Sequence, residues 1–348
     1  MKTRTMLMRQ NTLSSRIRTA LGAVALTGGL LSAVPANAAI MFTFDYSDNA
    51  PGVGFLDPSN GIARQNALNT AGTLFSGLFS TYFTNSAVLN FAVTSTDDIT
   101  STTLASASSN FVAEPGTFGA GEVIRNKLIN GTDINGAALD GNVDVNWGDA
   151  WELDPNTPAV ASGPNPTFDF YAALFHEFTH ALGFGSEISG SPASDRFSQG
   201  GDGTNTAGSW SKWDQFLTDG NGTSLINPST YEVDQAAVSD AQSNGGRFAG
   251  ANAIAAYGSA APLFADPDQS HLDEATFSVP NAAMNYMMKP LRDYGPQEAR
   301  NYSGLEVGIL TDLGYTRLDV DPNTVPEPST ILLMLAALAG FGLIRRRA

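Results

Sequence analysis

The segment at residues 175–186, FHEFTHALGFGS, constrains the fold of this chain more than any other. Apolar side chains recur through residues 169–182 at spacings of three and four, which predicts an α-helix with one buried face. At 100° per residue, His176 and His180 project from roughly the opposite side of that helix. Gly183 predicts its end, because glycine adopts the left-handed conformation at little cost. The segment therefore predicts a packed helix that presents two imidazoles one turn apart.

Two histidines at this spacing can bind one metal ion, and Glu177 beside them can take a proton from water. The chain has three histidines and no cysteine, so a nitrogen-rich metal site has almost no other choice than His271 for a third ligand. In the extended motif HExxHxxGxxH, which starts here at His176, the third ligand would stand at position 186. Ser186 occupies that position, but a neutral hydroxyl binds zinc poorly. We therefore expect removal of the Ser186 hydroxyl to have little effect. Glu232 is the other candidate third ligand, and two surface histidines on an ordinary helix are the alternative without a metal.

Both ends of the chain have the composition of targeting signals. Residues 1–39 combine a basic start, an apolar run and the sequence Ala-Asn-Ala, which is typical of a secretory signal peptide. At the other end, Pro326, Glu327 and Pro328 precede an apolar stretch at residues 331–344 and three arginines. A 14-residue helix is about 21 Å long, shorter than the roughly 30 Å hydrocarbon core of a membrane. The tail is therefore either a short transmembrane anchor or a sorting signal.

The region between these signals is strongly acidic. Residues 40–325 contain ten basic and 33 acidic side chains, a formal net charge of −23. This balance leaves no basic surface for nucleic acid and is compatible with divalent cations. Asp202, Asp219 and Asn221 can be interpreted as calcium ligands or as turn residues, since the spacing of an EF-hand is absent.

The remaining patterns predict an α+β fold, because helical and alternating segments follow one another up to Gly183. Each predicted element has a local signal, either apolar periodicity, a capping pair or a turn sequence. They are a helix at 62–82, a strand at 87–95 with Leu89, Phe91 and Val93 on one face, a helix at 121–130 ended by Gly131, a strand at 141–148, a hairpin at 213–225, and a helix that starts with the Ser303 and Glu306 capping box and ends at Gly314.

The motif at residues 175–186 resembles the active-site helix of metzincin-like zinc metallopeptidases. Its departure at Ser186 resembles the leishmanolysin-like subset, in which an insertion separates the third histidine from the motif. The resemblance implies a zincin-like fold of two lobes, with an N-terminal mixed sheet and active-site helix and a mostly irregular or helical C-terminal lobe. It also implies that His176, His180 and His271 bind one catalytic Zn²⁺ and that Glu177 is the general base for hydrolysis of a peptide substrate.

The same family places a methionine-bearing turn beneath its zinc, shortly after the third ligand. By this resemblance Met288 is the expected turn residue, with Met284 as the alternative. Tyr286 or Tyr294 is suggested as an oxyanion stabiliser only because both lie near these methionines in the sequence.

The tail resembles the PEP-CTERM signals of Gram-negative bacteria, which an exosortase recognises and cleaves. This resemblance implies export to the cell surface or extracellular matrix. The expected organisation is a signal peptide at 1–39, a catalytic lobe at 40–186, a C-terminal lobe at 187–318, a linker at 319–330 and a sorting segment at 331–348. The alternative to a peptidase is a matrix-associated binding protein with a structural or inactive zinc site.

Overall fold

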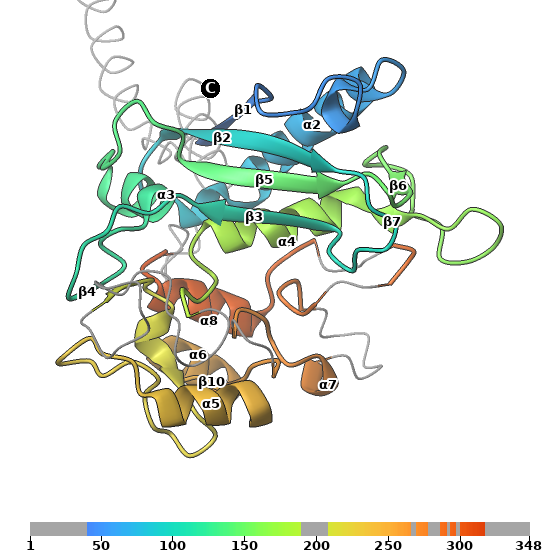
Figure 1. Ribbon diagram of the computed structural model, residues 1–348. Coiled ribbons are helices and arrows are strands. Elements are labelled where there is room, and N and C mark those ends of the chain that lie inside the picture. Colours follow the sequence, from blue (N-terminus) through green and yellow to red (C-terminus); the bar gives the residue numbers. More distant parts are fainter. Residues whose placement is uncertain are drawn as a thin grey trace, which may run out of the picture. The chain divides into compact units, whose positions relative to one another are not determined.

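A four-stranded sheet dominates the N-terminal half of the computed structural model, which describes residues 40–188, 208–265, 269–277, 286–290, 293–296 and 300–316 (Figure 1). Three strands are parallel, and the edge strand β3 runs antiparallel to its neighbour β5. In their order across the sheet, the strands are β1 (Ile40–Asp45), β2 (Ala87–Thr96), β5 (Gly141–Asn146) and β3 (Ala105–Ser109).

One face of this sheet is buried and the other is more polar. The predicted alternation in β2 is confirmed, because Leu89, Phe91 and Val93 are all buried. On the opposite face, the Asp144 carboxylate accepts hydrogen bonds from Thr94 Oγ1 at 2.7 Å and from Thr96 at 3.0 Å. A sheet with one apolar and one polar face needs apolar side chains from other elements to cover its apolar face only.

Helices α2 (Gly61–Phe79) and α4 (Phe170–Ala181) supply that layer. The ring of Phe42 in β1 contacts Phe75 of α2 and Phe178 of α4, with centroids 5.9 and 4.8 Å apart. One strand residue thus touches both helices, so both pack on the same face. The motif helix therefore lies against the sheet as its apolar stripe predicts.

The predicted helix at 62–82 is present as α2 followed by the 3₁₀ turn η2 (Ser80–Tyr82). Its buried face is narrower than the sequence pattern indicates. Leu74 and Leu78 belong to the apolar series but are 38% and 48% exposed, whereas Phe75 and Phe79 are buried. The sheet and α4 cover only the side of the helix that carries the phenylalanines.

The predicted helix at 121–130 is also present, in two parts. α3 (Val123–Arg125) continues as the π-helical turn η3 (Asn126–Asn130), and Gly131 ends it with φ of 65°. The positive φ explains the glycine at this position.

Short elements make up the rest of the described chain, and three small sheets join some of them: β9, β10 and β11 antiparallel, β4 with β8 parallel, and β6 with β7 parallel. They are η1 (Gly54–Leu56), β4 (Thr117–Phe118), β6 (Trp151–Glu152), β7 (Phe168–Asp169), β8 (Ser209–Trp210), η4 (Asp214–Phe216), β9 (Leu217–Thr218), α5 (Gln235–Asn244), β10 (Arg247–Phe248), α6 (Ala251–Tyr257), β11 (Ala261–Pro262), α7 (Glu274–Phe277) and α8 (Gly304–Asp312).

Two local predictions after α4 are confirmed. In the hairpin, Thr218 pairs with Ser224, and Asp219 Oδ1 accepts hydrogen bonds from the backbone N–H groups of Asn221 and Thr223. Such bonds from an aspartate side chain to the following backbone N–H groups are typical of a turn. They occupy one carboxylate oxygen of Asp219, which the sequence also offers as a calcium ligand. The capping box of α8 is complete, with Ser303 and Glu306 exchanging hydrogen bonds between side chain and backbone.

The fold is therefore mixed α/β, with one main sheet and several helices. Within the described residues no helix is both long and apolar enough to cross a membrane. The signal peptide, the tail from residue 317 onward, Asp202 and Met284 lie outside the described residues.

Candidate metal centre

Helix α4 has a polar cap at its start and a glycine at its end. Asp169 caps its start, where Oδ1 accepts a hydrogen bond from Ala172 N at 3.0 Å, and Arg300 pairs with the same carboxylate at 2.7 Å. Gly183 ends the helical segment with φ of 96°, as the sequence predicts. Most of the helix is buried, and His180 and Glu177 are its partly exposed members. The sheet and the caps therefore hold the motif in one orientation.

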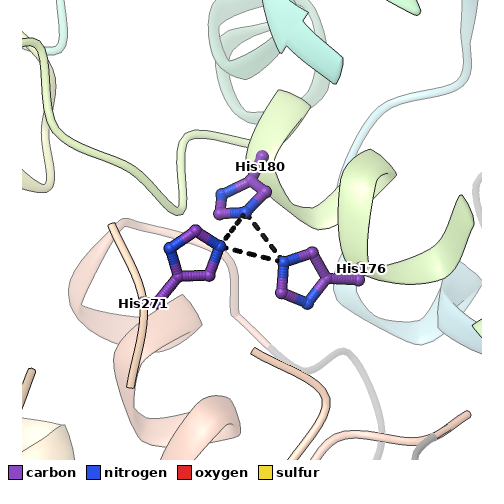
Figure 2. A group of neighbouring side chains, drawn as sticks. All are labelled: His176, His180 and His271. Carbon is purple, nitrogen blue, oxygen red and sulfur yellow. Dashed lines mark hydrogen bonds between the residues drawn. The ribbon is translucent and has the colours of Figure 1, made fainter. Parts of the chain in front are cut away.

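His271 reaches this helix from a segment far along the chain (Figure 2). The backbone on both sides of the residue is paired: Phe264 N donates to His271 O, and Leu272 N donates to Met288 O, both at 2.9 Å. These bonds place the third imidazole beside the two on α4. The three histidines thus lie close together, and their role as metal ligands stays a prediction.

The three Nε2 atoms form a nearly equilateral triangle. They are 3.0 Å apart between His180 and His176, and 3.2 Å from each of these to His271. Nitrogen ligands at Zn–N distances of about 2.0–2.1 Å around a tetrahedral ion lie about 3.3–3.4 Å apart. The triangle is therefore close to the size that one such ion requires.

The other ring nitrogens show which atoms carry the protons. His176 Nδ1 lies 2.6 Å from Met287 O, and His180 Nδ1 lies 2.6 Å from Phe184 O. A carbonyl oxygen only accepts hydrogen bonds, so each Nδ1 carries the hydrogen and each neutral ring keeps a lone pair on Nε2. Burial lowers the pKa of His176 well below its usual range, and His180 and His271 lower it further. When both rings are neutral, two lone pairs face each other at 3.0 Å, an arrangement that a cation between them stabilises.

Glu177 lies next to the triangle and contacts the edge of the sheet. Its Oε2 accepts a hydrogen bond from Ala107 N in β3 at 3.1 Å. Burial raises the pKa of the Glu177 carboxyl to about 8, and the Ala107 bond opposes the rise. A general base works best when its pKa lies near the operating pH, and burial moves the pKa of Glu177 from the usual carboxyl range toward neutrality.

A cavity of about 410 Å³ opens over these groups. Its lining includes the whole of β3, from Ala105 to Ser109, together with His180, His271 and Glu177. The side chains of the β3 wall are alanines and serines, which leave space beside the strand. The cavity thus joins an edge strand of the sheet to two of the three metal-ligand candidates, His180 and His271.

The buried carboxylate of Glu306 holds the backbone next to the carbonyl group that faces His176 Nδ1. Glu306 Oε1 accepts a hydrogen bond from Met288 N at 2.7 Å, and its Oε2 accepts one from Ser303 N at 2.7 Å. The preceding residue, Met287, supplies the carbonyl that faces His176. Glu306 thus holds the backbone that orients the first ligand. Sequence reasoning identified this residue only as part of a capping box.

The structure locates the other predicted site residues as follows. Met288 is fully buried in the segment beside His176, although the hydrogen-bonding partner of that ring is the Met287 carbonyl. The described residues that line the cavity do not include Tyr286 or Tyr294. The ring of Tyr286 packs at a tilt against Phe277, and that of Tyr294 stacks on Phe168. The oxyanion suggestion for these tyrosines stays a prediction.

Glu232, the other candidate third ligand, precedes Val233, which pairs with Ile226 in an antiparallel β-bridge. The group of three neighbouring ligand candidates contains His271 and does not contain Glu232.

Comparison with known proteins identifies the C-terminal tail. Residues 324–348 match the PEP-CTERM protein-sorting motif, and Pro326, Glu327 and Pro328 lie within the match. No curated protein and no solved structure matches the chain. The match confirms the predicted sorting signal, supports export and cell-surface sorting in bacteria, and implies processing by an exosortase-type enzyme.

Proposed function

We propose that this protein is an exported, zinc-dependent endopeptidase with a zincin-like, two-lobed fold. The observation that carries the proposal is the triangle of Nε2 atoms of His176, His180 and His271, 3.0–3.2 Å apart beside a cavity. A triangle of neutral histidines without a metal would hold the Nε2 lone pairs in mutual repulsion. Glu177 on the cavity wall adds the group that hydrolysis needs and a structural metal does not.

In this proposal His176, His180 and His271 hold the ion, and Glu177 moves the proton. A bound Zn²⁺ supplies Lewis-acid polarisation of the scissile carbonyl and of water. Glu177 accepts a proton from the attacking water and then gives it to the leaving amine. Ala107 N–H holds Oε2 of this carboxylate and so limits the positions that the base can adopt.

The shape of the cavity favours an extended peptide as substrate. β3 ends the strand order of the main sheet, and all five of its residues line the cavity. An extended chain can add to such an edge through backbone hydrogen bonds to β3 residues other than Ala107, whose N–H bonds to Glu177, with its side chains pointing alternately to the two sides. Because the strand has small side chains, the cavity also leaves room for those of the substrate.

The Glu177→Gln variant tests the proposal. It should bind Zn²⁺ with unchanged stoichiometry and lose nearly all hydrolysis, because the amide cannot accept the proton. Activity is measured as release of fluorescent fragments from an unfolded, labelled protein, and metal content by elemental analysis. Glu114→Gln is the matched control, since Glu114 is exposed.

Hydrolysis at the wild-type rate by Glu177→Gln would remove this residue from the mechanism. A wild-type protein that binds zinc and cleaves nothing would instead favour the matrix-associated binding protein with a structural ion.

A further inference from the structure

Ser186 occupies the motif position of a third ligand, yet its contacts lead to the segment that carries His271. Its backbone N–H donates to Ser270 Oγ at 3.0 Å, across 84 positions of the sequence. Its hydroxyl donates to Asp214 Oδ1 at 2.5 Å and accepts from Ile188 N at 3.0 Å. Ser270, the neighbour of His271, is therefore hydrogen-bonded to the last residue of the motif segment.

Asp214 organises the turn in which Ser186 lies. The carboxylate is 1% exposed, and besides Ser186 it contacts Glu187 N at 3.1 Å, Ser211 N at 2.9 Å and Ser211 Oγ at 2.9 Å. Ser211 Oγ also lies 3.0 Å from Gly185 O. A buried carboxylate with this many donors holds its partners in one arrangement, because each lost bond leaves a buried charge less satisfied.

The residue before Asp214 connects the same two segments on an apolar side. Trp213 packs on Phe184 with ring centroids 4.4 Å apart, and its Nε1 donates to Gln269 O at 3.2 Å. Phe184 in turn supplies the carbonyl that faces His180 Nδ1. Residues 213–214 therefore contact the turn at 184–187, which follows His180, and the backbone at Gln269, which precedes His271.

We propose that Asp214, acting through Ser186, is a positioning residue that fixes His271 relative to His180 in the metal centre. The proposal rests on the metal site of the proposed function. Three ligands bind an ion tightly when their geometry is set beforehand, because binding then costs little ordering of the chain. The hydroxyl of Ser186, which the sequence predicts to be dispensable, has this indirect role in place of coordination.

The test compares metal affinity in full-length Ser186→Ala and Asp214→Asn variants with that in Ser186→Thr, which keeps the hydroxyl. Loss of a group that orients a ligand typically lowers metal affinity about 10- to 100-fold. We expect a loss in that range for Ser186→Ala and Asp214→Asn, and affinity within about threefold of wild type for Ser186→Thr. Co²⁺ is the probe, because its visible absorption also reports the coordination geometry.

Asp144→Asn is the matched control, since that carboxylate also accepts two hydroxyl hydrogen bonds but lies in β5 of the main sheet. Urea unfolding of the metal-free proteins shows whether each variant folds. If Asp214→Asn does not fold, Ser186→Ala decides, because Ser186 is only partly buried. Wild-type Co²⁺ affinity and spectrum in a folded Ser186→Ala would overturn the proposal, as would a wild-type protein that binds no Co²⁺. Failure of peptide hydrolysis alone would refute the peptidase and leave this result standing.

Discussion

Glu122 should make the stability of the fold depend on pH, and its neutral variant should remove that dependence. The side chain is 2% exposed and lies behind Gly183, where a Cβ would be 2.4 Å from Oε1. Oε2 accepts a hydrogen bond from Lys212 N at 2.9 Å, whereas no donor in the described part of the chain bonds to Oε1. Burial raises the pKa of Glu122 to about 7, although the nearby Arg125 guanidinium opposes the rise.

The size of the effect follows from this shift. Because the folded-state pKa is above the unfolded value, the folded protein keeps a proton that the unfolded chain has already released. The resulting stability is present at low pH and is lost as the pH rises toward 7. Each pH unit in this interval corresponds to about 1.4 kcal/mol, so the loss between pH 5.5 and pH 8.5 is about 2 kcal/mol. Glu122→Gln is neutral at every pH and should not show this loss.

The assay is urea unfolding of both proteins at pH 5.5 and pH 8.5, with a chelator present so that metal binding does not contribute. The free energy of unfolding of Glu122→Gln, relative to wild type, should rise by about 2 kcal/mol between the two pH values. Glu114→Gln, at an exposed position, should show no such change. Parallel pH curves for wild type and Glu122→Gln would refute the reasoning, because Glu122 would then be ionised already at pH 5.5.

Three further predictions concern the metal centre, its support and the tail. His271→Ala should abolish most of the rise in melting temperature that Zn²⁺ produces, because only two of the three nitrogen ligands are left to bind the ion; an undiminished rise would exclude His271 from the site. Glu306→Gln should lower the free energy of unfolding by about 1–3 kcal/mol, since its amide nitrogen must face one of two N–H groups; unchanged urea midpoints would contradict this. Joint replacement of Pro326 and Pro328 should leave an uncut, membrane-associated precursor, and normal maturation on gels would favour a plain anchor instead of a sorting signal.

The sequence alone predicts those features that depend on residues close together along the chain. The spacing of His176 and His180, the stop at Gly183 and the capping box of Ser303 and Glu306 all follow from helix geometry and local hydrogen bonding. The strand alternation in β2 and the turn at Asp219 are predictable for the same reason. In each case the interacting groups are at most a few residues apart, so the pattern contains the information.

The tertiary structure decides how distant segments meet. The sequence offers His271 as the remaining histidine, but its distance from His180, 91 positions earlier, depends on how the chain between them folds back. The carbonyl acceptor from Met287 and the carboxylate of Asp214 have no sequence signature, and the capping-box pattern of Glu306 does not show that this carboxylate also holds Met288 N. Backbone groups carry no residue-type signal, and buried carboxylates resemble surface ones in sequence, so only packing shows which of them orient the metal ligands.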